Sequence, residues 1–131
     1  VIDMKSPEST IDILINSKFN ANINTEVLLS TFKNILADQY NSKLERVLRH
    51  SIYLLLKNEL LTFQNLERLI TEVEFRNKIL KESQEVESSI KSFFLTDFND
   101  LRNHSYTEAI SPIVSVIEEL KILMYLMLPP A

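Results

Sequence analysis

Hydrophobic residues recur at helical spacing along most of the chain, so each run places its apolar side chains on one face of an α-helix. The clearest run contains Leu44, Val47, Leu48, Ile52, Leu55 and Leu56. Upstream, from Thr25 onward, the stripe is Val27, Leu28, Phe32, Ile35 and Leu36. Shorter stripes follow, namely Leu66, Leu69 and Ile70, then Phe75, Ile79 and Leu80, then Val86, Ile90, Phe93 and Phe94. The pattern predicts an all-α fold, a compact bundle of about six or seven helices.

Polar residues that can cap a helix precede several of these stripes. The segment SKLE at 42–45 is typical of a capping box, in which Ser42 and Glu45 satisfy each other's backbone N–H groups. Thr62 is expected to cap the helix that carries the third stripe. The segment SYTE at 105–108 is a second capping box, and it predicts that the last helix opens at Ser105.

Pro112 lies inside that last helical run. A proline in a helix interior removes an N–H donor and clashes with the carbonyl one turn earlier, at a cost of about 3 kcal/mol. Either the helix kinks at Pro112, or Ser111 caps a new helix that has Pro112 at its first position. The second arrangement avoids the cost, and both predict a bend at this point.

Residues 1–23 lack a clear stripe and are interpreted as an N-terminal connecting segment ahead of a helical domain at 24–131. The first three residues, VID, are typical of the end of a short strand, and Ser6 with Pro7 is typical of the start of a short helix. The asparagines between 16 and 24 indicate a loop. Because the chain starts with valine and shows no signal-peptide pattern, it is interpreted as a piece of a larger cytoplasmic protein.

The C-terminal segment is apolar on every side, with seven consecutive hydrophobic residues from Ile122 to Leu128. This run is too short to cross a membrane, and Pro129 ends any helix behind it. A surface helix packs on its own bundle through one apolar stripe. The remaining apolar face of this segment is therefore available to pack on another protein surface. The segment therefore predicts an interface with the parent protein or a partner through Tyr125, Leu126 and Leu128, or self-association of the excised chain.

The composition excludes several kinds of functional site. The chain contains no glycine and no cysteine, which excludes glycine-rich phosphate loops, disulfides and thiolate metal sites. The net charge of −4 gives no general attraction for nucleic acid. His50 and His104 lie far apart in sequence, and the adjacent Glu118 and Glu119 point apart on a helix, so neither pair predicts a metal site or a catalytic dyad. We expect no catalysis and no cofactor in this chain.

One cationic cluster remains as a candidate for partner binding. Arg46, Arg49 and His50 are spaced i, i+3 and i+4 on the face opposite the main apolar stripe. They are interpreted either as a docking patch or as a solvated face that pairs with Glu45 and its neighbours.

Four segments follow one another in a recognisable order: LERVLRHSIYLLL (44–56), LERLITEVEFRNKIL (66–80), VESSIKSFFLTDF (86–98) and AISPIVSVI (109–117). Together they resemble the all-α domain of type IV coupling proteins, the TraG/TraD-like motors of conjugation and type IV secretion in the FtsK–HerA class of ATPases. The matching residues are Phe75 and Arg76, then Phe93, Phe94, Asp97 and Phe98, with Phe for Trp and Asp for Glu, and finally Ala109, Pro112 and Ile113. The resemblance covers about residues 25–120.

This resemblance implies that the chain recruits substrates for a translocation motor. The ATPase site, with its ATP and magnesium, would lie elsewhere in a parent protein anchored at the inner membrane. VIDMK at 1–5 is similar to a motor-domain strand, so the start of the chain either belongs to that motor or was joined to the helices from elsewhere. The implied partners are effector proteins or relaxase-bound DNA, adaptor proteins and the motor domain, and the acidic charge favours proteins over bare DNA. The alternative is a free-standing helical adaptor or secretion chaperone.

Overall fold

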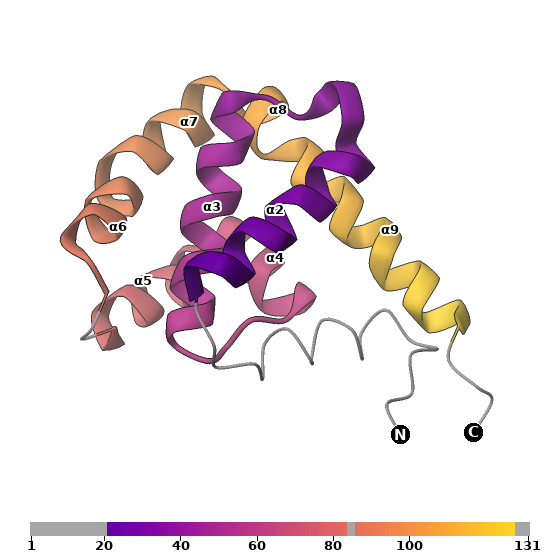
Figure 1. The fold of residues 1–131 in the computed structure, drawn as a ribbon. Helices are drawn as coiled ribbons and strands as arrows, with labels where there is room; N and C mark the ends of the chain where they lie inside the picture. The colour runs from indigo at the N-terminus through magenta and orange to yellow at the C-terminus, as the bar shows by residue number, and fades with distance from the viewer. Residues whose placement is uncertain (1–20, 84–85, 128–131) are drawn as a thin grey trace.

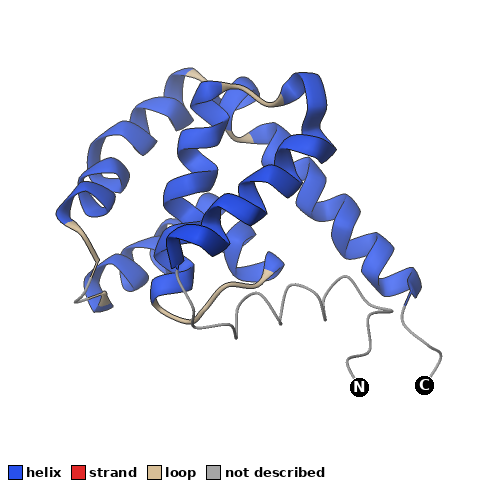
Figure 2. Cartoon of the chain, in the orientation of Figure 1, coloured by secondary structure: helices blue, strands red, loops and turns tan. Residues whose placement is uncertain are grey.

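The computed structural model describes residues 21–83 and 86–127, and its regular elements in these ranges are all helical (Figures 1 and 2). They are α2 (Ala21–Leu36), the 3₁₀ turn η1 (Ala37–Gln39), α3 (Ser42–Lys57), α4 (Phe63–Thr71), α5 (Val73–Glu82), α6 (Ser88–Ser92), the π-helical segment η2 (Phe93–Asp97), α7 (Phe98–His104), α8 (Tyr106–Ala109) and α9 (Ser111–Met127). The predicted all-α bundle is confirmed. Counting α6, η2 and α7 as one run and leaving the single turn α8 aside, the described residues form six helices. The features predicted at VID, Ser6 and Pro7 lie outside the described residues.

Helix α3 is the centre of the bundle, with α2 crossing it and α6, α7 and α9 lying to its sides (Figure 1). It packs against α2, α4 and α8, so apolar residues on several of its faces are covered. The predicted stripe is buried, with Leu56 partly so, and Leu54 and Tyr53 are buried beside it. Each buried aliphatic side chain contributes about 1.5–3 kcal/mol to folding, so this helix supplies the largest share of the core.

Helix α2 begins earlier than the sequence predicted. The chain is already helical at Ala21, so Asn22 and Asn24 are helical residues and the predicted loop is wrong for both. Asn24 and Thr25 are buried. Asparagine prefers turns only weakly, and packing of this turn against the bundle outweighs that preference.

The buried face of α2 is also rotated relative to the predicted stripe. Leu28, Phe32 and Leu36 are buried as expected, but Val27 and Ile35 are exposed. Leu29, which the stripe omitted, is buried instead. The side that α2 turns toward α3 therefore includes Leu29, and periodicity alone allowed a face shifted by a fraction of a turn.

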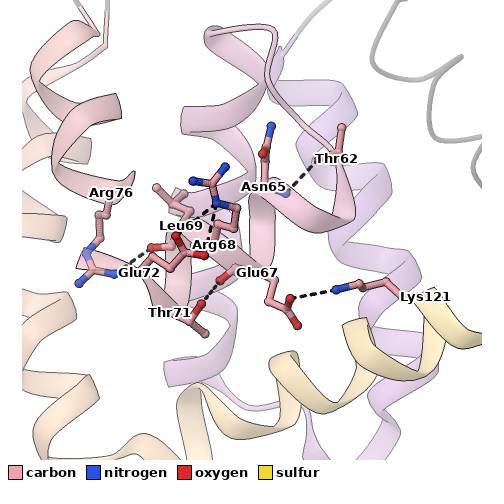
Figure 3. A network of polar contacts seen from close by, with 9 residues as sticks. All are labelled: Thr62, Asn65, Glu67, Arg68, Leu69, Thr71, Glu72, Arg76 and Lys121. Atoms are coloured by element: carbon pink, nitrogen blue, oxygen red, sulfur yellow. Dashed lines mark hydrogen bonds and ion pairs between the residues drawn. The ribbon is translucent and has the colours of Figure 1, made fainter. Parts of the chain in front are cut away.

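Two of the predicted capping motifs behave differently from expectation, and one is confirmed. Thr62 caps α4, accepting a hydrogen bond from the backbone N–H of Asn65 at 2.9 Å (Figure 3). At the start of α3 the cap is Asn41 rather than Ser42, because the Asn41 side chain accepts from the N–H of Leu44 at 2.9 Å. Asn41 has an extended backbone while Ser42 is already helical, which gives Asn41 the geometry that a cap requires.

The predicted box at 105–108 does not form. Ser105 precedes the single-turn helix α8 without a capping bond from its side chain. Lys43 of α3 engages both side chains of the motif, donating to Ser105 Oγ at 3.2 Å and lying 3.6 Å from a Glu108 carboxylate oxygen. The last helix, α9, starts beyond Ile110, and Pro112 occupies its first turn, where the missing N–H is not needed. The predicted break in the helix is therefore confirmed, but it lies at Ile110. Ser111 is already helical and does not cap α9, because the carbonyl of Ile110 accepts from Val114.

Three phenylalanines fill the space between α3 and the α6–α7 run. Phe93, Phe94 and Phe98 are all buried, and the Phe94 and Phe98 ring centroids lie 5.5 Å apart. The π-helical segment between α6 and α7 adds one residue to the turn, which changes the register of the side chains on either side of it. The burial of Phe93 and Phe94 confirms the apolar stripe predicted for them, and Phe98 adds a third ring to the core.

Phe75 and Arg76, two further residues of the family resemblance, join α5 to α4, and Figure 3 shows Arg76. Arg76 is 4% exposed, and its Nη1 donates to the carbonyl oxygens of Leu69 at 2.9 Å and Ile70 at 3.3 Å, in the last turn of α4. Phe75 is half-buried beneath the guanidinium of Arg68, 4.0 Å from the ring centroid. Both residues therefore join α5 to α4.

Candidate partner-binding surfaces

The polar face of α3 carries the three residues predicted to bind a partner, and the structure shows their contacts. Arg46 forms an ion pair with Asp97 of the π-helical segment, at 2.7 Å. Arg49 forms an ion pair with Glu26 of α2 and lies 3.8 Å from Glu45. Both arginines are therefore neutralised by carboxylates of the same chain.

His50 is held more firmly than a surface histidine. Its ring stacks on Phe93, with ring centroids 4.0 Å apart and planes inclined by 12°. Because a carbonyl oxygen only accepts, His50 Nδ1 carries the proton that it shares with Arg46 O at 2.6 Å. Burial lowers the pKa of His50, and the charges of Arg46 and Arg49 lower it further, against the opposing effects of the Arg46 carbonyl and the Asp97 carboxylate.

This lowered pKa predicts that His50 weakens the fold in acid. The unfolded chain, with a histidine pKa near 6.5, takes up the proton before the folded chain does, so stability is lost as pH falls below about 6.5. We expect the free energy of unfolding to decrease less between about pH 7.5 and about pH 5 in His50→Gln than in the unsubstituted chain. Urea unfolding followed by circular dichroism measures this difference, with His104→Gln as the matched control. An equal decrease in His50→Gln and the unsubstituted chain would contradict the assignment.

A pocket of about 180 Å³ adjoins this face. Among its lining residues are Glu26, Arg49, His50, Tyr53 and Glu87, from α2, α3 and the start of α6. Glu26 is paired with Arg49, and the Tyr53 hydroxyl donates to Glu87 at 3.2 Å. The charged groups of the pocket thus engage one another, and its chemistry does not define a ligand.

These contacts agree with the interpretation of Arg46 and Arg49 as a solvated face that pairs with its neighbours, whereas His50 is half-buried against Phe93. The alternative role of all three residues in docking a partner stays a prediction. The sequence predicted that the three residues share one face of α3 and that Glu45 lies near them. It gave no indication of the partners Asp97 and Glu26.

A second surface lies on α9, which runs along the bundle and projects beyond it at its C-terminal end (Figure 1). Ile113 and Ile117 are fully buried in the first half of the helix. Lys121 then ties α9 to α4, with its Nζ 3.0 Å from Glu67 Oε1 (Figure 3). The hydrogen bond to Glu67 raises the pKa of Lys121, so the pair is charged at neutral pH.

Three apolar side chains of α9 beyond Lys121 are exposed. Ile122, Leu123 and Leu126 are 58%, 52% and 72% exposed, and we call these three residues the α9 patch. Leu126 was one of the predicted interface residues, whereas Ile122 and Leu123 were not singled out. The Tyr125 side chain and Leu128 lie outside the described residues.

Neither surface resembles a catalytic or metal site within the described residues. Residues 21–83 and 86–127 contain no cluster of three histidine, cysteine or carboxylate side chains that could hold a metal ion. In the same ranges no helix has both the length and the hydropathy to span a bilayer. No protein family, curated protein sequence or solved structure matches this chain.

Proposed function

We propose that this chain is a helical recruitment domain that docks a partner protein through the α9 patch. The observation that carries the proposal is the exposure of Ile122, Leu123 and Leu126 together on a helix whose earlier apolar residues are buried or partly buried. Adjacent large apolar side chains that stay in water are typical of protein interaction sites. A helix that is anchored at one end and projects at the other presents such residues without disturbing the core.

We propose further that the recruitment serves a type IV secretion or conjugation motor, in which this chain is the all-α domain of the coupling ATPase. The support is the order of the four matching segments along the sequence. Their key residues are also packed where a structural motif needs them: Arg76 and Phe98 are buried in contact, and Pro112 lies in the first turn of α9. In this role the cargo is an effector protein or relaxase-bound DNA, and ATP is hydrolysed outside this chain.

The test is partner capture by two variants that carry the same change at different exposed leucines. Leu126→Glu alters the α9 patch, and Leu95→Glu alters the π-helical segment, where Leu95 is 66% exposed. We expect Leu126→Glu to lose capture of proteins from the cytoplasm of the source cells, with unchanged helicity, and Leu95→Glu to retain it. Mass spectrometry of the captured proteins then tests the narrower proposal, which requires relaxases, effectors or their adaptors. Equal capture by both variants would exclude the α9 patch as the docking site.

A further inference from the structure

The α9 patch continues into a charged residue on the same helix face. Glu119, Ile122, Leu123 and Leu126 are spaced i, i+3, i+4 and i+7, so they form one stripe along the outside of α9. Glu119 is exposed and makes no ion pair with the part of the chain that the structure describes. Its neighbour Glu118 differs, because it lies 4.0 Å from Lys121, which also binds Glu67. Glu119 is thus the carboxylate that a partner on this stripe would meet.

The other end of the stripe is negative as well. A helix carries a partial negative charge at its C-terminal end, where the last carbonyl groups lack N–H partners. The last turn of α9 contains no basic residue that would offset this charge. The apolar stripe therefore lies between a carboxylate and a negative helix end.

These charges argue against a second copy of this chain as the occupant. Two α9 helices packed in parallel bring Glu119 next to Glu119, and packed antiparallel they bring Glu119 next to the negative end of the other helix. Both arrangements place like charges together, which disfavours association.

We propose that the α9 stripe binds a basic amphipathic helix of a partner protein. The partner's apolar residues would pack on Ile122, Leu123 and Leu126, and lysine or arginine residues at the two ends of its apolar face would meet Glu119 and the C-terminal end of α9. Helix-on-helix recognition through residues at this spacing is a common mode of peptide binding. The inference rests on the proposed function and adds the chemistry of the partner to it.

The test uses two designed helical peptides of about 20 residues, long enough to be helical in solution. Both carry the same leucine stripe, flanked by lysine in one and by glutamate in the other. Fluorescence anisotropy at low and high salt measures their affinity for the unsubstituted chain, for Glu119→Lys and for Ile122→Ser/Leu126→Ser. Glu74→Lys is the control for net charge, because Glu74 is an exposed carboxylate on α5, on the other side of the bundle from the end of α9 (Figure 1).

We expect the lysine peptide to bind about tenfold or more tightly than the glutamate peptide, with the preference weakening in high salt. Glu119→Lys should remove that preference, Glu74→Lys should leave most of it, and the double serine variant should lose both peptides. If both peptides bind equally and only the serine variant loses them, the basic partner is wrong and the docking site stands. If the serine variant binds both peptides normally, or no peptide binds at about 1 mM, the inference and the docking site both fall. Sedimentation that shows a dimer dissociated by the serine substitutions would assign the stripe to a second copy and overturn the inference.

Discussion

Replacing Phe98 with alanine is expected to lower the free energy of unfolding by about 3–5 kcal/mol. The Phe98 side chain is fully buried, its ring lies 5.5 Å from that of Phe94, and the guanidinium of Arg76 lies 4.6 Å from its centroid. Alanine would lose the apolar area and leave a cavity between α5, α7 and the π-helical segment. Since a domain is stabilised by only about 5–15 kcal/mol in total, this loss is a large share of its stability.

Urea unfolding followed by circular dichroism measures the effect, and two further substitutions serve as controls. Phe98→Leu keeps most of the volume and should cost less than the alanine variant. Leu95→Ala removes an exposed side chain from the same π-helical segment and should change stability by no more than about 0.5 kcal/mol. If Phe98→Ala behaved like Leu95→Ala, the phenylalanine cluster would not be part of the core.

The features that the sequence predicted correctly depend on local rules. The stripe of α3 and the cap at Thr62 are read from residues a turn or two apart, and the proline rule placed the break before α9. The cap of α3 shows the limit of these rules. Asn41 and Ser42 are both good capping residues, and the backbone decided between them by making Asn41 extended.

Apart from Glu45, the partners of the polar α3 face could not be predicted, because they are distant in sequence. Arg46 pairs with Asp97, 51 residues away, and Arg49 with Glu26, 23 residues away. Spacing along one helix says which residues share a face but not what another helix places opposite them. The same limit explains Lys43, whose contacts with Ser105 and Glu108 replaced the expected capping box.

The sequence predicted an interface in the C-terminal half of α9, but it did not identify all the exposed residues there. A run that is apolar on every side has no periodicity to distinguish its covered face from its bare face. The distinction follows from where α9 leaves the bundle, next to the Lys121–Glu67 ion pair. The sequence could therefore indicate an interface in this segment. The packing of α9 on α4 was needed to identify Ile122 and Leu123 as part of it.

Charge reversal at Arg76 is expected to destabilise the chain by more than about 4 kcal/mol, because it places a carboxylate in the core whose loss of water the nearby charge of Arg102 offsets only in part. The Arg76 guanidinium donates to two carbonyl groups at the end of α4, and Figure 3 shows the bond to Leu69. It also lies over the Phe98 ring, 4.6 Å from the centroid. In Arg76→Glu the new carboxylate would face those carbonyl oxygens and the electron-rich face of the ring. None of these groups can donate a hydrogen bond to it.

Arg76→Met is the matched control, because methionine keeps much of the apolar stem and removes the donor. The carbonyl groups of Leu69 and Ile70 would lose their side-chain donor, which costs about 1–3 kcal/mol. Part of this cost is offset, since Arg76 forms no ion pair with a carboxylate in the described residues and its burial as a cation is unfavourable. Burial lowers the pKa of Arg76, and the nearby charge of Arg102 lowers it further. We therefore expect the methionine variant to be clearly more stable than the glutamate variant.

The pH dependence separates the effect of charge from that of shape. A buried carboxyl group has a raised pKa, so the folded Arg76→Glu chain would bind a proton more tightly than the unfolded chain, whose glutamate pKa is about 4.3. Its stability relative to Arg76→Met should then increase as pH falls from about 7 to about 5, because the protonated carboxyl group can donate to the carbonyl oxygen of Leu69. Urea unfolding of both variants at the two pH values measures this change. Equal stability of the two variants at neutral pH would mean that a side chain at position 76 reaches water, and that α4 and α5 are not joined by a buried cation.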